Sequence, residues 1–254
     1  MRLKLFAFAL LFTASLFARA EEAADPAKAA PAGRTYAAIS LLSDALEVAK
    51  ARGETGSHLT STVTRVPLPS PVYDTVALLA IKDVFDKKGT EKPVILLRSS
   101  EKMYAQQNEI LDGKKYNSPA GLDATLNASK VTHLLIVSKI RESARVKLGN
   151  VTIGSGKLQG LGYYLDFNVP TANSDSNEKG RGVIAPYAYF KVSLVDLATS
   201  TVTNETLVTA GYAASSSTTT ASADPWNSLT NEEKDTVLKE LVQKEVSKAV
   251  ASLL

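Results

Sequence analysis

The sequence predicts an α/β (α+β) protein with a single mixed sheet, two hairpins, a parallel crossover, helices packed on the sheet, and a long C-terminal amphipathic helix. Three observations lead to this prediction. Short continuous apolar runs at 93–97 and 131–137, separated by helical patterns, are typical of parallel strands covered on both faces. Alternating apolar and polar residues follow in the second half. A stripe of apolar residues at helical spacing ends the chain.

The N-terminal segment has the pattern of a secretory signal peptide. Arg2 and Lys4 precede an apolar run over 5–17, and small residues surround the expected cleavage site after Ala20. The run is shorter than the roughly 20 residues that span a bilayer, which argues against a membrane anchor. We therefore assign 1–20 to a signal peptide and expect a periplasmic or secreted protein.

Removal of the signal peptide changes the charge of the protein. It takes away Arg2, Lys4 and Arg19 but no carboxylate, so the formal net charge falls from +3 to zero. A neutral chain without a basic run gives no electrostatic reason to bind nucleic acid or anionic lipid. The chain has no cysteine, so neither a disulfide nor a lipidated cysteine is available. We expect no nucleic-acid partner and no membrane insertion of the mature chain.

The remaining chain divides into a linker and a domain. The alanine- and proline-rich segment 21–33 predicts a flexible linker, and 34–254 is expected to form a single α/β domain. Two short strands joined by a turn are predicted at 36–42 and 46–48. Glycines and prolines across 53–70 lower the expectation of regular structure there.

An amphipathic helix is predicted between Pro71 and Gly89. Ser70 and Pro71 suit the cap and the first position of a helix, and Gly89 suits its end. A stripe that predicts packing on the sheet comprises Tyr73, Ala77, Leu78, Ile81, Val84 and Phe85. The expected polar face carries Asp74, Lys82, Asp83 and Asp86.

The middle of the chain predicts a strand–helices–strand unit. The run at 93–97 indicates a buried central strand, and the run at 131–137 indicates a second strand covered on both faces. Helices are expected over 100–112, ended by Gly113, and after Ser118-Pro119. This order implies a parallel pair of strands with a right-handed crossover.

Two hairpins follow. The first spans 140–153, with Gly149 and Asn150 at its tip, where both residues can take positive φ. The second joins alternating strands at 187–195 and 202–208. It has the stronger pattern of the two.

The C-terminal segment contains the clearest helix. After a low-complexity loop over 213–224, Thr230 and Glu233 have the spacing of a capping box. The apolar stripe comprises Val237, Leu238, Leu241, Val242, Val246, Ala249, Val250 and Leu253. We expect a helix over 230–253 that packs against the sheet.

Motifs for catalysis, cofactors or metals are absent from the sequence. The glycine-rich stretch 154–162 departs from both the phosphate-loop and the dinucleotide patterns, and predicts a twisted or bulged strand whose small residues face large neighbours. His58 and His133 stand alone without cysteine, so we expect no zinc site and a structural, hydrogen-bonded His133. We assign no catalytic residue, cofactor or metal.

Carboxylate catalysis by a secreted hydrolase remains an alternative, because the required separation of two carboxylates is a spatial property. The candidates are Asp166, Asp175 and Asp196. Asp196 has a simpler interpretation as a turn residue whose carboxylate binds nearby backbone amides.

Aromatic residues are concentrated between Tyr163 and Phe190. A polar loop over 173–182, long enough to move, interrupts them. Tyrosine, arginine and an adaptable loop are typical of recognition surfaces, whereas rings alternating along strands also fill cores. On the first interpretation, the residues that bind a partner are Tyr163, Tyr164, Arg181, Tyr187 and Tyr189.

The segment 189–202, in which a strand ending in Leu-Val-Asp leads through a turn to a return strand, resembles a signature of bacterial envelope α/β domains. These are the curli-secretion lipoproteins, the outer-membrane activators of penicillin-binding proteins and the amino-terminal domain of the Tol-system propeller protein. The strand predicted at 132–140 and the helix predicted at 230–253 are similar to elements of the α/β layout of these domains. Ser200 stands where glycine is usual, and the lipidated cysteine of the first two groups is missing.

The resemblance implies a periplasmic interaction domain rather than an anchored pore or activator, and it carries over no site residue. With the missing catalytic motifs, it leads to an exported, periplasmic, non-enzymatic binding or adaptor protein of the bacterial cell envelope. The expected partner is an envelope protein or polymer.

Overall fold

The computed structural model describes residues 33–51, 62–89, 93–172, 179–216 and 224–254. Several sequence-based assignments lie outside these ranges: the signal peptide, the linker up to residue 32, His58 and Asp175. Residues 34–254 form one compact unit.

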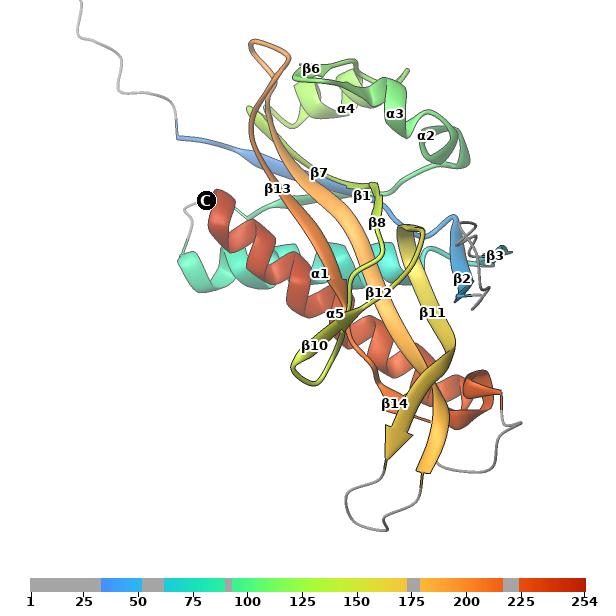
Figure 1. The fold of residues 1–254 in the computed structure, drawn as a ribbon. Coiled ribbons are helices and arrows are strands. Elements are labelled where there is room, and N and C mark those ends of the chain that lie inside the picture. Colours follow the sequence, from blue (N-terminus) through green and yellow to red (C-terminus); the bar gives the residue numbers. More distant parts are fainter. Residues whose placement is uncertain (1–32, 52–61, 90–92, 173–178, 217–223) are drawn as a thin grey trace, which may run out of the picture. The chain divides into compact units, whose positions relative to one another are not determined.

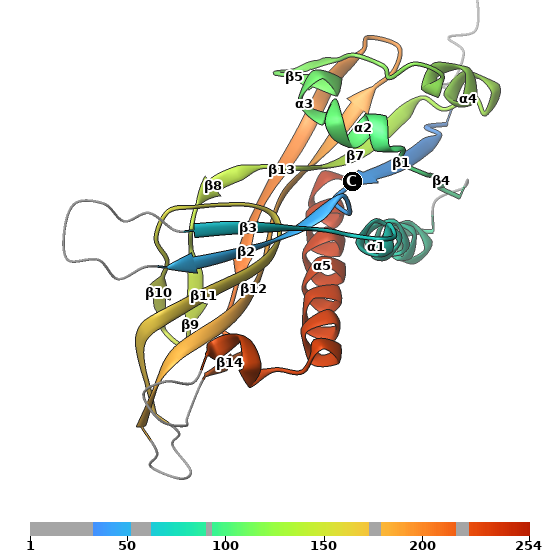
Figure 2. The ribbon, with the colours of Figure 1, turned by 90° about the vertical axis from the view of Figure 1, so that its right-hand side faces the viewer.

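One long strand, β12 (Lys179–Asp196), organises a sheet that divides into two branches (Figures 1 and 2). Along one edge, the first half of β12 pairs antiparallel with β11 (Lys157–Ala172). Its second half pairs antiparallel with β7 (His133–Lys139) at the same edge. The sheet therefore splits where β11 gives way to β7.

Each branch continues outward through two more strands. From β11 the sheet continues to β2 (Ala45–Ala51), which is parallel to β11, and then to β3 (Thr62–Pro67), which is antiparallel to β2. From β7 it continues to β1 (Tyr36–Leu41) and β4 (Ile95–Leu97), and β7, β1 and β4 are mutually parallel. The parallel strands that the sequence predicts are present, with β1 between them.

The opposite edge of β12 carries β13 (Thr201–Gly211) and the short β14 (Ser215–Ser216). This is the second hairpin expected from the sequence. At the start of β13, Thr201 pairs with Lys115 of a small hairpin. This hairpin is formed by β5 (Leu111–Asp112) and β6 (Lys115–Tyr116).

The expected first hairpin forms a separate two-stranded sheet of β9 (Val146–Leu148) and β10 (Val151–Ile153). Gly149 lies at its tip with φ of 55°, a left-handed conformation that glycine adopts without steric cost. The preceding β8 (Arg141–Ser143) pairs with the start of β11. The β9–β10 hairpin therefore belongs to neither branch of the large sheet. It lies beside the end of β13, where Lys147 bridges to Tyr212.

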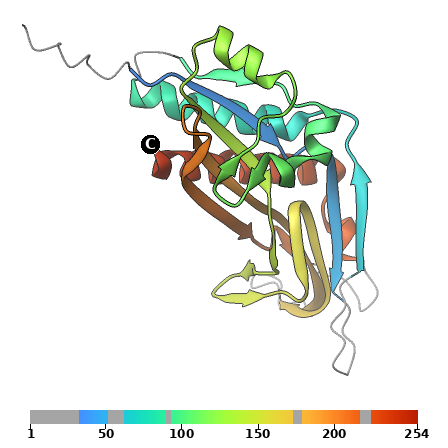
Figure 3. The same cartoon turned by 90° about the horizontal axis from the view of Figure 1, so that it is seen from above.

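Helices cover both faces of the sheet. On one face, α1 (Val72–Lys88) and α5 (Asn231–Leu253) pack against each other and share a core with β1, β7, β11, β12 and β13 (Figures 1 and 3). On the other face, a second core joins the β4–β1–β7 branch to α2 (Glu101–Ala105), α3 (Gln107–Ile110) and α4 (Leu122–Ala128). A short 3₁₀ helix, η1 (Pro225–Ser228), precedes α5.

Local signals account for the ends of the two long helices. α1 ends at Gly89, which is left-handed and donates its N–H to the Asp86 carbonyl oxygen. α5 begins with the expected capping box, in which Thr230 and Glu233 satisfy each other's backbone N–H groups. The mixed α/β fold that the sequence predicts is confirmed.

Three local predictions need correction. Residues 62–67, expected to be irregular, form β3, whose side chains are all exposed and whose backbone is held by β2. The run at 93–97 forms a strand at the end of its branch, because β4 pairs only with β1 among the described strands. Asp74, placed on the polar face of its helix, is 3% exposed, because the first turn of α1 lies against the β1–β2 turn.

Candidate functional site

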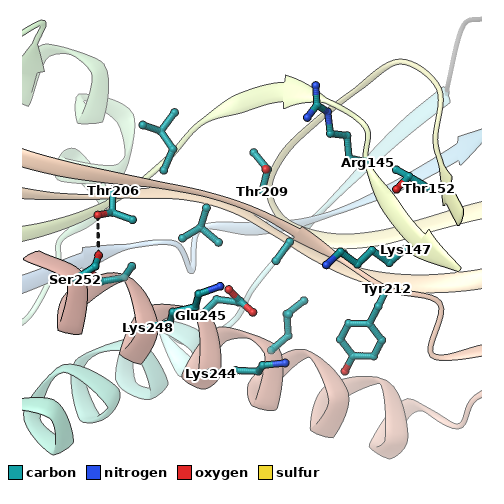
Figure 4. A pocket seen from close by; sticks show the side chains of 16 residues that line it. Arg145, Lys147, Thr152, Thr206, Thr209, Tyr212, Lys244, Glu245, Lys248 and Ser252 are labelled. Carbon is teal, nitrogen blue, oxygen red and sulfur yellow. Dashed lines mark hydrogen bonds between the residues drawn. The ribbon is translucent and has the colours of Figure 1, made fainter. Parts of the chain in front are cut away.

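A cavity of about 630 Å³ lies along the outer edge of β13. We call it the β13 groove: it is lined by residues 206–212, by Arg145, Lys147 and Thr152 around the β9–β10 hairpin, and by one face of α5 from Leu241 to Ser252. Figure 4 shows β13 passing between the hairpin residues on one side and α5 on the other. Three separate parts of the sequence therefore form the groove.

The groove has an excess of positive charge. Arg145 and Lys147 line it from the hairpin side, Lys244 and Lys248 line it from α5, and Glu245 is the one acidic residue that lines it. All four cationic residues are exposed, and none of them forms an ion pair with a carboxylate within the described part of the chain. In contrast, Lys239 on the same helix is paired with Asp235 at 2.5 Å. The groove is thus suited to an anionic ligand.

Two buried tyrosines hold the hairpin wall of the groove. The hydroxyl of Tyr189 accepts a hydrogen bond from the Arg145 N–H at 2.8 Å, where the chain enters the hairpin. The hydroxyl of Tyr164 accepts one from the Ser155 N–H at 3.1 Å, where the chain leaves it. Both rings pack in a core cluster with Val146 of the hairpin. These phenols therefore fix both ends of the hairpin.

A third tyrosine supports the opposite wall. The Tyr163 hydroxyl donates a hydrogen bond to the Lys234 carbonyl oxygen in the first turn of α5 at 2.6 Å. The Tyr187 hydroxyl makes a longer contact, 3.5 Å, with the Glu47 carbonyl oxygen of β2. Burial raises the pKa of all four phenols, which are consequently neutral and able to donate at physiological pH.

The structure therefore places the predicted tyrosines inside the fold. Tyr163 is 2% exposed, and Tyr164, Tyr187 and Tyr189 are fully buried, so their rings offer no area to a partner in this conformation. Arg181 is exposed on β12 but lies outside the β13 groove. The tyrosines fill the core, as in the second interpretation of the sequence pattern, and three of them position groove walls.

Of the three carboxylates considered for hydrolysis, Asp175 lies outside the described residues, and Asp166 and Asp196 are not brought together. Asp166 pairs in register with Val183 near the start of β12, whereas Asp196 is the last residue of that strand. The rise of about 3.3 Å per residue places them on the order of 40 Å apart along β12. Asp196 accepts hydrogen bonds from the N–H groups of Ala198 and Thr199, as expected of a turn residue.

A second polar region, which sequence reasoning missed, lies at the carboxyl ends of β1, β4 and β7. The buried Asp74 carboxylate accepts hydrogen bonds from the Ser40 hydroxyl (2.5 Å), the Leu42 N–H (2.7 Å) and the Tyr104 hydroxyl (2.5 Å). A longer one comes from the Ser43 N–H at 3.3 Å. Burial raises the pKa of Asp74, and these hydrogen bonds oppose the rise. We call this region the turn cluster, because it fastens the β1–β2 turn.

Lys139 holds the same turn from the point where the sheet branches. Its side chain is 4% exposed and forms an ion pair with Asp44, which also binds Arg65 of β3 at 2.6 Å. Burial lowers the pKa of Lys139 to about 8. A cavity of about 720 Å³ lies next to this turn. The acidic groups that fasten the turn are already bound within the fold.

His133 at the start of β7 has the structural environment expected for it. Its Nδ1 lies 2.9 Å from the Thr132 hydroxyl, and its ring contacts the ring of Tyr36. No group of three or more histidine or acidic side chains that could hold a metal ion occurs among the residues described. Within the same residues, no helix combines the length and the apolar character needed to cross a bilayer.

Comparison with known proteins gives a distant structural likeness. No family model matches the chain, and no curated protein matches it. The crystal structure of the protein XCC0632 from Xanthomonas campestris, described under the family model DUF330, is similar with a TM-score of 0.40 and 11% sequence identity, over 87% of this chain and 83% of that chain.

Proposed function

We propose that this chain is an exported, non-enzymatic adaptor of the bacterial cell envelope that binds an anionic partner in the β13 groove. The observation that carries the proposal is the set of four cationic side chains, Arg145, Lys147, Lys244 and Lys248, which line one groove with a single carboxylate, Glu245, and form no ion pair among the described residues. Cations that lack internal partners keep their full attraction for an external anion.

Two features of the sequence support the cellular setting. The first is the signal-peptide pattern of residues 1–20. The second is the resemblance of 189–202 to envelope interaction domains. We infer that the mature chain begins at Glu21 in the periplasm, where its partner is an envelope protein or polymer. Amino-terminal sequencing of the protein from the periplasmic fraction tests this inference, because an intact Met1 would contradict it.

The groove is tested with a simple anionic probe, poly-glutamate. We expect binding that weakens as salt is added, because exposed charges are screened over about 10 Å at 0.1 M ionic strength. The double variant Lys244→Gln/Lys248→Gln should bind about tenfold more weakly, since each exposed charge contributes up to about 1 kcal/mol. Isothermal titration calorimetry measures both effects.

A matched control lies on the same helix. Lys239 is already paired with Asp235 and does not line the groove, so Lys239→Gln should bind poly-glutamate like the unmodified protein. Equal losses in Lys239→Gln and in the double variant would show that binding depends on overall charge and not on the groove. Absence of any binding at low salt would overturn the proposed function.

A further inference from the structure

The outer edge of β13 lacks a partner strand over most of its length. At one end Thr201 pairs with Lys115 of β6, and at the other end Tyr212 bridges to Lys147 of β9. Between these two points, none of the strands in the described ranges pairs with this edge. The β13 groove runs along the same stretch (Figure 4).

Hydrogen bonds at the end of β13 identify the backbone groups that face the groove. The Tyr212 N–H donates to the Pro186 carbonyl oxygen on the β12 side, at 3.4 Å. In an antiparallel pair, successive residues alternate between bonding toward the partner strand and pointing away from it. The register is regular from Tyr187–Gly211 to Leu194–Asn204. Leu207 and Thr209 therefore direct their N–H and C=O groups into the groove.

The side chains around this edge agree with an open docking surface. Leu207 is 56% exposed and lies next to the groove on this edge. Val208, its neighbour, is buried in the core that contains α5. The edge is therefore backed by a packed helix on one face and leaves apolar area uncovered on the other.

We propose that an extended acidic segment of a partner protein binds in the β13 groove as an additional strand along β13. This inference rests on the proposed function and specifies the class of partner. An extended polypeptide supplies donors and acceptors at the spacing of the free edge, and strand addition is a common mode of peptide recognition. A polysaccharide does not match this spacing.

Charge on both walls explains why the segment is acidic. Side chains of an added strand alternate between its two faces. One set points to the α5 side, where Lys244 and Lys248 lie, and the other set points to the hairpin side, where Arg145 and Lys147 lie. Acidic residues on either face therefore meet unpaired cations.

The probe is a blocked octapeptide of alternating glutamate and valine, made also in two N-methylated forms. One form is methylated at every second amide and the other at every amide, so all three peptides carry the same charge. An added strand uses only every second N–H toward β13, so the first form keeps the N–H groups that it needs. We expect methylation of every amide to weaken binding about tenfold or more and methylation of every second amide to change it little.

A pair of protein variants tests the same edge through changes in β13 itself. Thr209→Pro removes an N–H that faces the groove but none that bonds to β12, and proline is tolerated on edge strands. Thr209→Ala removes the side chain and keeps that N–H. We expect Thr209→Pro to lose binding of the octapeptide about tenfold and Thr209→Ala to retain it. Circular dichroism establishes that both variants fold, and the peptide series decides the question if Thr209→Pro does not.

The outcomes separate strand addition from simple charge attraction. Loss with one methylation pattern and retention with the other supports strand addition. Equal binding of all three peptides overturns it and leaves the groove as an anion-binding site. Equal binding of an anionic polysaccharide, heparin, together with no effect of methylation, also overturns it in favour of a polymer partner. If neither the octapeptide nor poly-glutamate binds, the proposed function fails as well.

Discussion

The turn cluster and the β13 groove are both polar regions beside cavities of similar size, but their charged groups have different partners. In the turn cluster, Asp74 accepts four hydrogen bonds from the fold, and Asp44 is paired with Lys139 and Arg65. In the β13 groove, four cations line the cavity beside a single carboxylate, Glu245, and none of the four forms an ion pair among the described residues. Polar residues bound within the fold stabilise it, whereas unpaired ones beside a groove are available to a ligand.

The largest effect on stability is expected at Asp74. Asp74→Ala leaves the Leu42 N–H and the hydroxyls of Ser40 and Tyr104 without their acceptor, and should lower the free energy of unfolding by about 3 kcal/mol. Urea denaturation measures the change. Asp86→Ala on the same helix is the control, because its exposed pair with Lys82 contributes at most about 1 kcal/mol. A loss at Asp74 no greater than that of the control would show that the turn does not depend on this carboxylate.

A smaller effect is expected from the tyrosines that hold the hairpin. Tyr189→Phe removes the acceptor of the Arg145 N–H and should cost about 1 kcal/mol, with faster hydrogen exchange in β9 and weaker binding of the octapeptide. Tyr187→Phe is the matched control, since this equally buried hydroxyl contacts β2 and not the hairpin. Similar exchange in β9 for both variants would contradict the positioning role of Tyr189.

His133 provides a pH-dependent effect that is smaller still. Burial, with a contribution from Arg34, lowers the pKa of His133 below 6.5, while Asp196 opposes the shift. The folded state therefore favours the neutral ring, so its stability falls as the pH drops below about 6.5 until the folded pKa is reached. His133→Asn should reduce the loss of stability between pH 7.5 and pH 5, measured by urea denaturation. An unchanged slope would refute this assignment.

The groove cations should have the smallest effect on stability. Lys244→Gln/Lys248→Gln breaks no ion pair among the described residues, so we expect the free energy of unfolding to change by less than about 0.5 kcal/mol. Thermal unfolding at low salt measures this change. A destabilisation of more than about 1 kcal/mol, twice the expected bound, would mean that these lysines stabilise the fold and would remove the contrast with the turn cluster.

Local signals account for the elements that the sequence predicted well. The capping box at Thr230, the stop at Gly89 and the Gly149 hairpin tip each depend on residues close together in the chain. β3 was missed because its exposed threonines and valines carry no burial pattern, and its pairing with β2 is the interaction that holds it. The spacing of apolar residues within one segment does not show which strand that segment pairs with.

The candidate site could be predicted only in part, for the same reason. The aromatic pattern draws attention to Tyr164 and Tyr189 as partner-binding residues, whereas the structure buries both, because the sequence does not say which face of a strand a helix or hairpin covers. The groove unites Arg145 with Lys248, which are far apart in the chain and meet only because the hairpin and α5 flank β13. Asp74 is an acidic residue in the pattern of an amphipathic helix, and such a residue is expected on the exposed face. Its burial depends on contact with a turn about 30 residues earlier in the chain, which the helical pattern does not reveal.

The order in which the strands appear along the chain governs when the sheet can close. β2 and β1 come first, yet the strand that joins their two branches, β12, comes only at Lys179–Asp196. Contacts over such separations form slowly, because a long loop must close before they can stabilise the chain. A nascent chain is therefore expected to stay open until most of it has been synthesised, and an open chain is the form that the proposed export requires.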